Sequence, residues 1–479
     1  MRITLPTQSR QLGPICIMQQ IDVLELESRP TRRSRVRPSS ASASASATAT
    51  ATASASASAP VVAAAAAAAA AHPDSVAFPN HVLEAVFEKM VIIVPCKDEP
   101  VKTIQNVLRG IPPDCAVILV SNCSGGYRAK ASMLEGACRY GREAVLVHQK
   151  YRGAAAAFDA VGVPELLDRA APGRHETKIR DGKGEGMYLG IAMARTFFPD
   201  REYVGFVDAD NQVPGSVNEY CRVYAAGFTL SKQYCGESGD SGDDDSEHVM
   251  VRISWPSKPK VRDGEISFDE PEGRSSRVVN SFLNRLFAEP FGDASKFITT
   301  GNAGEHAMTM DMALSSRWAN GYAIETYQFM DPFLRAGSSL RETRAEGSLH
   351  ALPNSSSPVR ILQIGTVNPH FHRQGNDVHI LRMWAAGLGA IWHSLGGFPG
   401  STGVIPGVGK DTIADLKSAM KAYALENGGI GTEEDLPQPR VYPAMDRLDF
   451  DEFENVLMSK RYLGEHGAPL FFGFDSQVE

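Results

Sequence analysis

Two aspartates that follow an apolar run are the residues of this sequence best placed to do chemistry. Residues 203–207 (YVGFV) lack polar alternation, which is typical of a buried β-strand, and Asp208 and Asp210 follow them closely. Side chains alternate along an extended chain, so the two carboxylates point the same way and can converge on one cation. Their hard oxygens suit Mg²⁺ or Mn²⁺, ions that can bridge a diphosphate. The alternative interpretation is an ordinary strand end.

The spacing Asp-x-Asp does not identify such a site by itself, because it recurs elsewhere in the chain. Asp243 and Asp245 belong to an acidic stretch that we interpret as solvated charge. Residues 448–455 (LDFDEFEN) have the pattern of a polar helix. Only Asp208 and Asp210 end a predicted buried strand, and this position distinguishes them.

Two basic clusters could bind anions. Segment 179–190 (IRDGKGEGMYLG) offers glycines that permit close backbone approach, Lys183 as a point charge for phosphate, and a predicted helix from about residue 187. Its spacing is not that of a P-loop, which argues against that class of ATPase. Segment 271–284 (PEGRSSRVVNSFLN) places arginines and serines at a helix start, which fits a phosphate or a carboxylate. A plain loop and a Ser N-cap with exposed arginines are the respective alternatives.

Two further clusters carry acid, base or metal-binding side chains. Segment 298–309 (ITTGNAGEHAMT) predicts a tight loop of small residues, followed by Glu305 and His306. Three histidines fall within segment 366–379: His370, His372 and His379. The His-x-His pattern on an extended segment puts two rings on one side, an arrangement that fits a metal site or acid–base chemistry. A buried structural histidine is the alternative.

The elements that must position these clusters form an alternating pattern. Strands are predicted at 90–95, 115–121, 143–149 and 203–209, and helices at 98–109 and 186–198. This alternation is typical of an α/β fold with a mostly parallel sheet flanked by helices. Ligands of such sheets bind beyond the carboxyl ends of the strands. Polar clusters follow all four strands, at 95–99, 121–122, 149–150 and 208–210, so we expect them to face one crevice.

Composition excludes several classes of function. The chain has 479 residues, 43% of them hydrophobic and 22% charged, and a net charge of −8, which argues against binding to nucleic acid. Its seven cysteines form no CxxC pair, which favours reduced intracellular thiols. No apolar run is long enough to cross a membrane. Acids within residues 21–28 argue against a transit peptide, so a cytoplasmic location is expected.

Three segments have a composition unlike that of a packed core. Residues 29–75 are dominated by Arg, Ser, Thr and Ala, without large apolar side chains, and we expect them to be disordered. Segments 232–248 and 336–358 lack a hydrophobic period, and we expect both to be surface loops.

Eight blocks of the sequence, in the same order, resemble the mannosyl-3-phosphoglycerate synthase family: VPCKDEP, VSNCSGG, VHQK, IRDGKGEGM, YVGFVDADNQVPGSVNEY, GRSSRVVNSFLN, TGNAGEHAM and NPHFH. The resemblance covers most of residues 1–28 and 77–400. It implies a retaining glycosyltransferase of the GT-A fold, which moves mannose from GDP-mannose to the 2-hydroxyl of D-3-phosphoglycerate. It also implies a divalent cation, with Mg²⁺ as the first choice and Mn²⁺ or Co²⁺ as alternatives.

The resemblance further implies roles for matching residues. The guanosine of the donor would lie against Pro95, Lys97, Glu99, Ser121, Asn122, Gln149 and Lys150, and its diphosphate beside Lys183. The acceptor would lie against Gly273, Arg274, Ser276 and Asn280. Asp210 would bind the metal together with His370 or His372. Asp208, Glu305 and His306 would lie near the transferred sugar or the ribose.

The resulting domain organisation is one catalytic domain with additions. Residues 1–28 and 76–400 would form the GT-A domain, 29–75 an insertion, and 401–479 a mainly helical C-terminal extension. The alternative functions are a glucosyl-3-phosphoglycerate synthase, a sugar-1-phosphate nucleotidyltransferase and a non-enzymatic nucleotide-sugar sensor. A nucleotidyltransferase should carry a Gly-rich basic loop after its first strand, where this chain has VPCKDEP. The oligomeric state stays open, with a homodimer as one candidate.

Overall fold

The computed structural model describes most of the chain outside the low-complexity stretch. The described ranges are 1–12, 14–26, 74–124, 141–169, 177–236, 248–262, 265–268, 272–287, 296–345, 359–372, 377–396, 408–428, 436–463, 465 and 467–472. Of the predicted disordered insertion, all but Asp74 and Ser75 lies outside these ranges.

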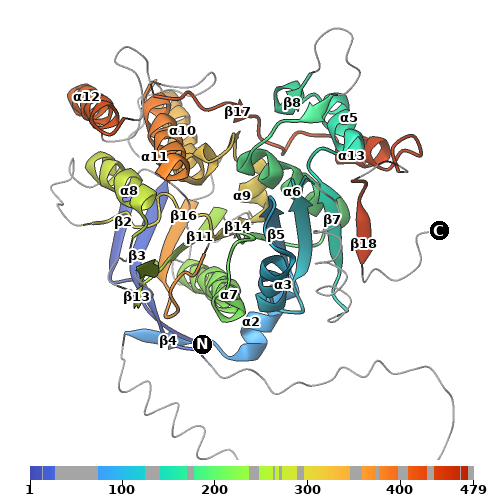
Figure 1. Ribbon diagram of the computed structural model, residues 1–479. Coiled ribbons are helices and arrows are strands. Elements are labelled where there is room, and N and C mark those ends of the chain that lie inside the picture. The colour runs from blue at the N-terminus through green and yellow to red at the C-terminus, as the bar shows by residue number, and fades with distance from the viewer. Residues whose placement is uncertain are drawn as a thin grey trace, which may run out of the picture.

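A twelve-stranded mixed sheet forms the centre of the molecule (Figure 1). In spatial order its strands are β18 (Leu470–Phe472), β7 (Ala144–His148), β6 (Ala116–Ser121), β5 (Met90–Cys96), β10 (Tyr203–Phe206), β14 (His306–Thr309), β11 (His248–Ser254), β16 (Val359–Gly365), β3 (Ile15–Glu25), β1 (Arg2–Thr4) and β4 (Ser75–Ala77), with β2 (Gln8–Leu12) beside β3. From β7 to β3 the strands are parallel except for β14, and the outer strands pair antiparallel.

Strand order explains where a ligand can bind. The first four strands of the α/β part lie in the order β7-β6-β5-β10. Along the chain, β6 and β7 are added on one side of β5 and β10 is added on the other side, so the topological switch point lies between β5 and β10. A crevice forms at such a switch point, beyond the carboxyl ends of the strands. Antiparallel β14 then follows β10. The predicted α/β architecture of the GT-A type is confirmed in this order.

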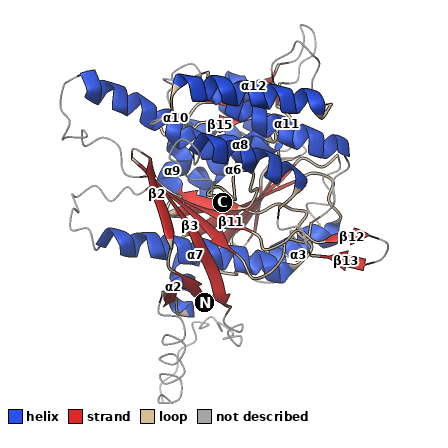
Figure 2. Ribbon diagram, turned by 90° about the vertical axis from the view of Figure 1, so that its left-hand side faces the viewer, coloured by secondary structure: helices blue, strands red, loops and turns tan. Residues whose placement is uncertain are grey.

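Apolar side chains on both faces of the strands explain the continuous hydrophobic runs. On β5, Val91 and Ile93 belong to the core on one face, whereas Ile92 and Val94 belong to the core on the other, and all four are fully buried. Helices cover both faces, as expected for a parallel sheet. Figure 2 shows the helices in layers above and below the strands.

The helices fall into two groups. One face carries α2 (Asn80–Phe87), α3 (Val101–Gly110) and α7 (Pro214–Gly236). The other face carries α5 (Arg152–Ala160), α6 (Lys183–Phe197), α8 (Arg274–Phe287), α9 (Met310–Ser315), α10 (Ala323–Ala345), α11 (Asp377–Ser394), α12 (Lys410–Glu426) and α13 (Phe450–Leu457). The latter group forms the helical layer that stands over the crevice.

Small elements complete the described structure. They are the 3₁₀ turn η1 (Pro164–Leu166), the pair β8 (Leu167–Asp168) and β9 (Lys178–Ile179), the hairpin β12 (Lys260–Arg262) and β13 (Glu265–Ser267), and the pair β15 (Trp318–Ala319) and β17 (Val441–Tyr442). Strands β17 and β18 tie the C-terminal residues to the rest of the fold, since β17 pairs with β15 and β18 extends the main sheet at β7.

The two predicted surface loops, 232–248 and 336–358, overlap with regular elements of the structure. Helix α7 continues through residue 236 and β11 begins at His248, while α10 continues through residue 345. Each added residue of an existing helix gains a backbone hydrogen bond, so helices extend past the point where the hydrophobic period stops. The rest of these segments, 237–247 and 346–358, lies outside the described residues.

Candidate active site

A cavity of about 1000 Å³ opens at the carboxyl ends of the central strands. Thirteen of the predicted site residues line it: Pro95, Lys97, Glu99, Asn122, Gln149, Lys183, Asp208, Asp210, Gly273, Arg274, Glu305, His370 and His372. Five others lie outside the lining: Ser121, Lys150, Ser276, Asn280 and His306. The expectation that the strand-end clusters face one crevice is therefore confirmed for each of the four strands.

Side chains at the end of β7 hold the segment that leads into α6. Gln149 donates to the carbonyl oxygens of Arg180 and Gly182, at 2.7 and 3.2 Å. Lys150 donates to the carbonyl of Ile179 at 2.6 Å and forms an ion pair with Asp181 at 2.9 Å. These contacts fix the backbone immediately before Lys183, so Gln149 and Lys150 also act as supports of the cavity wall.

Helix α6 begins at Lys183, earlier than the sequence predicted. Two of its glycines serve helix packing, whereas Gly182, just before the helix, lines the cavity. A Cβ atom at Gly184 would lie 2.0 Å from the carbonyl oxygen of Ala319, and one at Gly190 would lie 2.5 Å from Ile93. Larger side chains would force α6 away from its neighbours, which explains this glycine spacing.

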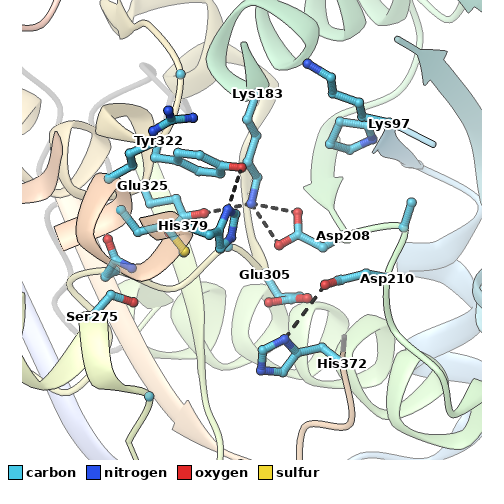
Figure 3. Close-up of a pocket in the computed structure, with 18 of the residues that line it drawn as sticks. Lys97, Lys183, Asp208, Asp210, Ser275, Glu305, Tyr322, Glu325, His372 and His379 are labelled. Atoms are coloured by element: carbon cyan, nitrogen blue, oxygen red, sulfur yellow. Dashed lines mark hydrogen bonds and ion pairs between the residues drawn. The ribbon is translucent and has the colours of Figure 1, made fainter. Parts of the chain in front are cut away.

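Lys183 lies between two carboxylates at the centre of the cavity (Figure 3). Its Nζ atom is 2.6 Å from Oδ1 of Asp208 and 2.8 Å from Oε1 of Glu325. Burial opposes the charge of Lys183, but the two carboxylates outweigh it and hold its pKa well above the usual value. Burial raises the pKa of Asp208, although Lys183 acts in the opposite direction. The three groups form one buried charge network.

Asp210 and His372 face each other beside this network. Oδ2 of Asp210 lies 3.8 Å from Nδ1 of His372. A dashed line marks this pair in Figure 3. The ring of His370 stacks on His372 and on Trp255, and its Nδ1 shares a hydrogen bond of 3.1 Å with the hydroxyl of Tyr220. The His-x-His pattern therefore does place both rings on one side.

The donor atoms at this point can be compared with the needs of a metal ion. Within the described ranges, no group of three or more His, Cys, Asp or Glu side chains is arranged to hold a metal. Asp210 and His372 supply two ligand atoms at a spacing that one ion can bridge. Mg²⁺-type sites in transferases use one or two protein ligands and take the rest from water and substrate phosphates. The residues present fit such a site.

Glu305 and His306 have different surroundings although they are neighbours in sequence. Glu305 lines the cavity, accepts a hydrogen bond from Nδ2 of Asn211 at 2.8 Å, and has its pKa raised to about 8 by burial and by Asp208. His306 is fully buried behind it, with its ring against Phe206. Burial lowers the pKa of His306 well below the usual value, so its ring is neutral.

The N-terminal end of α8 forms the wall opposite the strand ends. Gly273, Arg274 and Ser275 line the cavity, and a guanidinium nitrogen of Arg274 lies 2.6 Å from Asp377. Asn280 points elsewhere: it donates to the carbonyl of Thr299 and accepts from the backbone N–H of Gly301, both at 2.9 Å. Asn280 thus supports the loop 299–304.

Several lining residues were missed in the sequence: Trp255, Lys258, Tyr322, Glu325 and Arg382. Glu325 gave no clear signal, because it stands beside Thr326 and Gln328 in the sequence, and its burial to 3% exposure follows only from the fold. Lys258 lies in segment 255–259 (WPSKP), which has no hydrophobic periodicity that would predict a helix or a strand. Its place in the site follows only from the fold.

Comparisons with known proteins show the family of this sequence. The sequence model of the family described as "Mannosyl-3-phosphoglycerate synthase" matches residues 5–457. The chain belongs to the mannosyl-3-phosphoglycerate synthase family. The enzyme of that name from Pyrococcus furiosus is 33% identical over 384 residues, 79% of this chain and 86% of its own. The one from Aeropyrum pernix is 32% identical over 324 residues, 65% of this chain and 74% of its own.

Solved structures give weaker likenesses. Mannosyl-3-phosphoglycerate synthase from Rubrobacter xylanophilus aligns with 77% of this chain and 94% of its own, at 15% identity and a TM-score of 0.43. Glucosyl-3-phosphoglycerate synthase from Mycobacterium tuberculosis, solved with Mg²⁺ and UDP, aligns with 66% and 84%, at 16% identity and a TM-score of 0.40. Because both scores are below 0.5, the fold assignment rests on the strand order itself.

Family membership confirms the sequence-based prediction of a glycosyltransferase of the mannosyltransferase class. Within the described part of the chain, no helix has both the length and the apolar character needed to cross a membrane.

Proposed function

We propose that this chain transfers mannose, with retention of configuration, from GDP-mannose to the 2-hydroxyl of D-3-phosphoglycerate, releasing GDP and 2-O-mannosyl-3-phosphoglycerate. One observation carries the proposal: the polar ends of four strands and the N-terminal end of α8 line a single cavity. Membership of the family supports the choice of substrates. The donor would lie along the strand ends, and the acceptor along α8.

The guanosine would lie against Pro95, Lys97, Glu99 and Asn122, all of which line the cavity. Ser121 is buried behind this wall, and its Oγ accepts from the backbone N–H of Cys123 at 3.3 Å. We therefore assign to Ser121, Gln149 and Lys150 the role of holding the wall. Lys183, already paired with Asp208 and Glu325, would meet the donor diphosphate at the centre.

Asp210 and His372 would hold a divalent cation, with His370 behind His372. When bound, such an ion would neutralise charge on the diphosphate and make GDP a better leaving group. Mg²⁺ is the first choice for a carboxylate and substrate phosphates, while an imidazole ligand also suits Mn²⁺ or Co²⁺.

The remaining groups would orient the sugar and the acceptor. With its pKa at about 8, Glu305 is protonated at neutral pH and can donate a hydrogen bond to a sugar hydroxyl. His306, fully buried, would hold Glu305 in place rather than touch the sugar. No carboxylate of the motifs is an obvious nucleophile, so we favour attack from the face of the leaving group, with the departing phosphate taking the hydroxyl proton.

The experiment is an incubation of the purified chain with a panel of GDP- and UDP-sugars and acceptors, with and without Mg²⁺ or Mn²⁺, followed by product identification. A mannoside of phosphoglycerate formed only from GDP-mannose and only with metal is the expected result. A glucoside formed from a UDP-sugar would favour the glucosyl alternative. Release of pyrophosphate from a sugar 1-phosphate and a nucleoside triphosphate would favour the nucleotidyltransferase, and a ligand returned unchanged would indicate a sensor.

Two aspartate variants sharpen this test. Asp210→Ala should abolish turnover and leave the fold intact. Asp451→Ala is the matched control, because Asp451 belongs to another Asp-x-Asp pair, is exposed, and lies in the first turn of α13. Equal loss in both variants, or full activity of Asp210→Ala without metal, would overturn the scheme. The cytoplasmic location and the homodimer stay predictions.

A further inference from the structure

Lys258 is a cation at the cavity wall that forms no ion pair with any residue in the described part of the chain. It lines the cavity beside Trp255, and its Nζ lies 4.2 Å from the centroid of that ring. Among the described residues it makes no ion pair within 4.0 Å and no hydrogen bond. Asp210 and Glu305 attract its charge only from a greater distance. The ammonium is therefore held in place by the indole and remains available to an anion.

The ammonium of Lys258 also lies at the N-terminal end of α8. A Cβ atom at Gly273 would come within 3.4 Å of Nζ of Lys258 and 3.6 Å of Oγ of Ser276. The backbone, the ammonium and the hydroxyl thus meet around one point. Helix α8 has 14 residues, and the first N–H groups of a helix have no partner within it and favour an anion.

Ser276 gives an independent sign that a ligand belongs there. The residue is 6% exposed, and its Oγ has no hydrogen-bond partner among the residues that the structure describes. A buried hydroxyl without a partner is uncommon, because its desolvation costs about 1–3 kcal/mol. An oxygen of a bound anion at the start of α8 would satisfy it.

We infer that Lys258, positioned by Trp255, binds the phosphate of the acceptor together with Ser276 and the first turn of α8; the inference rests on the proposed transfer to phosphoglycerate. Several acids line this cavity, among them Asp208, Asp210 and Glu325, and their charges would repel an acceptor that carries both a phosphate and a carboxylate. A tetrahedral phosphate dianion can accept hydrogen bonds from several donors at once, here the hydroxyl of Ser276 and the first N–H groups of α8. The ammonium of Lys258 supplies the compact positive charge.

The test measures binding rather than turnover. Titration calorimetry on the full chain, with GDP and Mn²⁺ present, compares three probes: D-3-phosphoglycerate, glycerol 3-phosphate, which lacks the carboxylate, and D-glycerate, which lacks the phosphate. Lys258→Gln should weaken binding of both phosphate compounds about 10- to 100-fold and change the affinity for D-glycerate by less than about threefold. The affinity for GDP should not change.

The matched control is Lys89→Gln, which makes the same charge change at an exposed lysine paired with Glu202, just before the amino end of β5. It should bind all probes as the unmodified chain does. Equal weakening for glycerate and phosphoglycerate, with glycerol 3-phosphate unaffected, would assign Lys258 to the carboxylate and overturn the inference. Unchanged binding of all probes by Lys258→Gln would overturn it too.

Failure of the proposed function gives a different pattern. If phosphate compounds bind and depend on Lys258 but no mannoside forms, the transfer is refuted and the phosphate site stands. If the mannoside forms and Lys258→Gln binds phosphoglycerate normally, only the inference fails. An unmodified chain that binds none of the phosphate compounds would overturn both.

Discussion

The rings of His370 and His372 stack with their centroids 4.6 Å apart, yet they have different partners. Nδ1 of His372 lies 3.8 Å from Asp210 at the cavity, whereas Nδ1 of His370 shares a hydrogen bond with Tyr220. His370 is also stacked on Trp255 and is 5% exposed. On this difference we propose that His372 binds the metal and that His370 orients the ring of His372.

The first prediction separates these two histidines. His372→Ala should remove a metal ligand, abolish most turnover and raise the Mn²⁺ concentration needed for half-maximal activity. Tyr220→Phe removes the hydrogen bond to His370, which is not a ligand in this assignment, and should therefore weaken metal binding less than His372→Ala does. Mn²⁺ titration followed by electron paramagnetic resonance, with GDP present, measures the affinity directly. Normal Mn²⁺ binding by His372→Ala would contradict the assignment.

The second prediction concerns pH. Burial raises the pKa of Glu99 from 4.5 to about 7. A carboxylate can accept the N1–H and N2–H donors of guanine, and a neutral acid cannot accept both equally well. Guanosine binding should therefore strengthen as pH rises to about 7 and then level off, with up to tenfold weaker binding for each pH unit below. Guanosine is the proper probe because it has no phosphate that titrates in this range.

Calorimetric titration of guanosine between about pH 5.5 and 8.5 tests this, with Glu99→Gln as the control that should bind weakly and without pH dependence. The same shift affects stability with the opposite sign. Because the folded state binds this proton more tightly than the unfolded state, the contribution of Glu99 to stability falls as pH rises from about 4.5 to about 7. A pH-independent affinity of the unmodified chain would contradict the proposed role of Glu99.

The third prediction concerns Arg252, a fully buried guanidinium that donates to three backbone carbonyl oxygens and to the sulfur of Met250. It donates to Thr300 at 2.9 Å, Ala303 at 3.3 Å and Glu325 at 2.9 Å, so it ties the loop before Glu305 to the start of α10. Burial lowers its pKa to about 10, which still leaves it charged at neutral pH. Arg252→Met would remove three hydrogen bonds of a charged donor from a buried site and should destabilise the fold by about 3 kcal/mol or more.

Thermal unfolding and turnover measured together test this. The matched control is Arg169→Met, which removes an exposed ion pair with Asp159 and should cost less than about 1 kcal/mol. Arg252→Lys should not restore the fold, because an ammonium cannot copy the planar array of donors. Equal melting temperatures for the Arg252→Met and Arg169→Met variants would show that the buried contacts are not needed.

Much of this site could be predicted from the sequence, and the remainder could not for physical reasons. Asp208 and Asp210 were recognisable because a continuous apolar strand ends directly before them, and strand ends meet at one edge of a parallel sheet. Glu325 and Lys258 come from segments distant in sequence, and only tertiary packing brings them beside Lys183 and Gly273. The boundary of α7 was misjudged because helix propagation continues after the apolar pattern stops.

The fourth prediction concerns the insertion 29–75, which interrupts no motif. Strand β1 lies between β3 and β4, and Arg2 of β1 is opposite Glu25 of β3 on one side and Ala77 of β4 on the other. A linker that replaces the insertion must therefore cross from β3 to β4, a distance of about two strand spacings, or roughly 10 Å. An eight-residue Gly/Ser linker in place of residues 29–73 can span about 26 Å and should leave kcat/KM within about twofold. Replacing residues 29–77 by the same linker is the control: it also removes β4 and should lower the melting temperature. A loss of activity in the shorter deletion, with its melting temperature unchanged, would show that the insertion takes part in function.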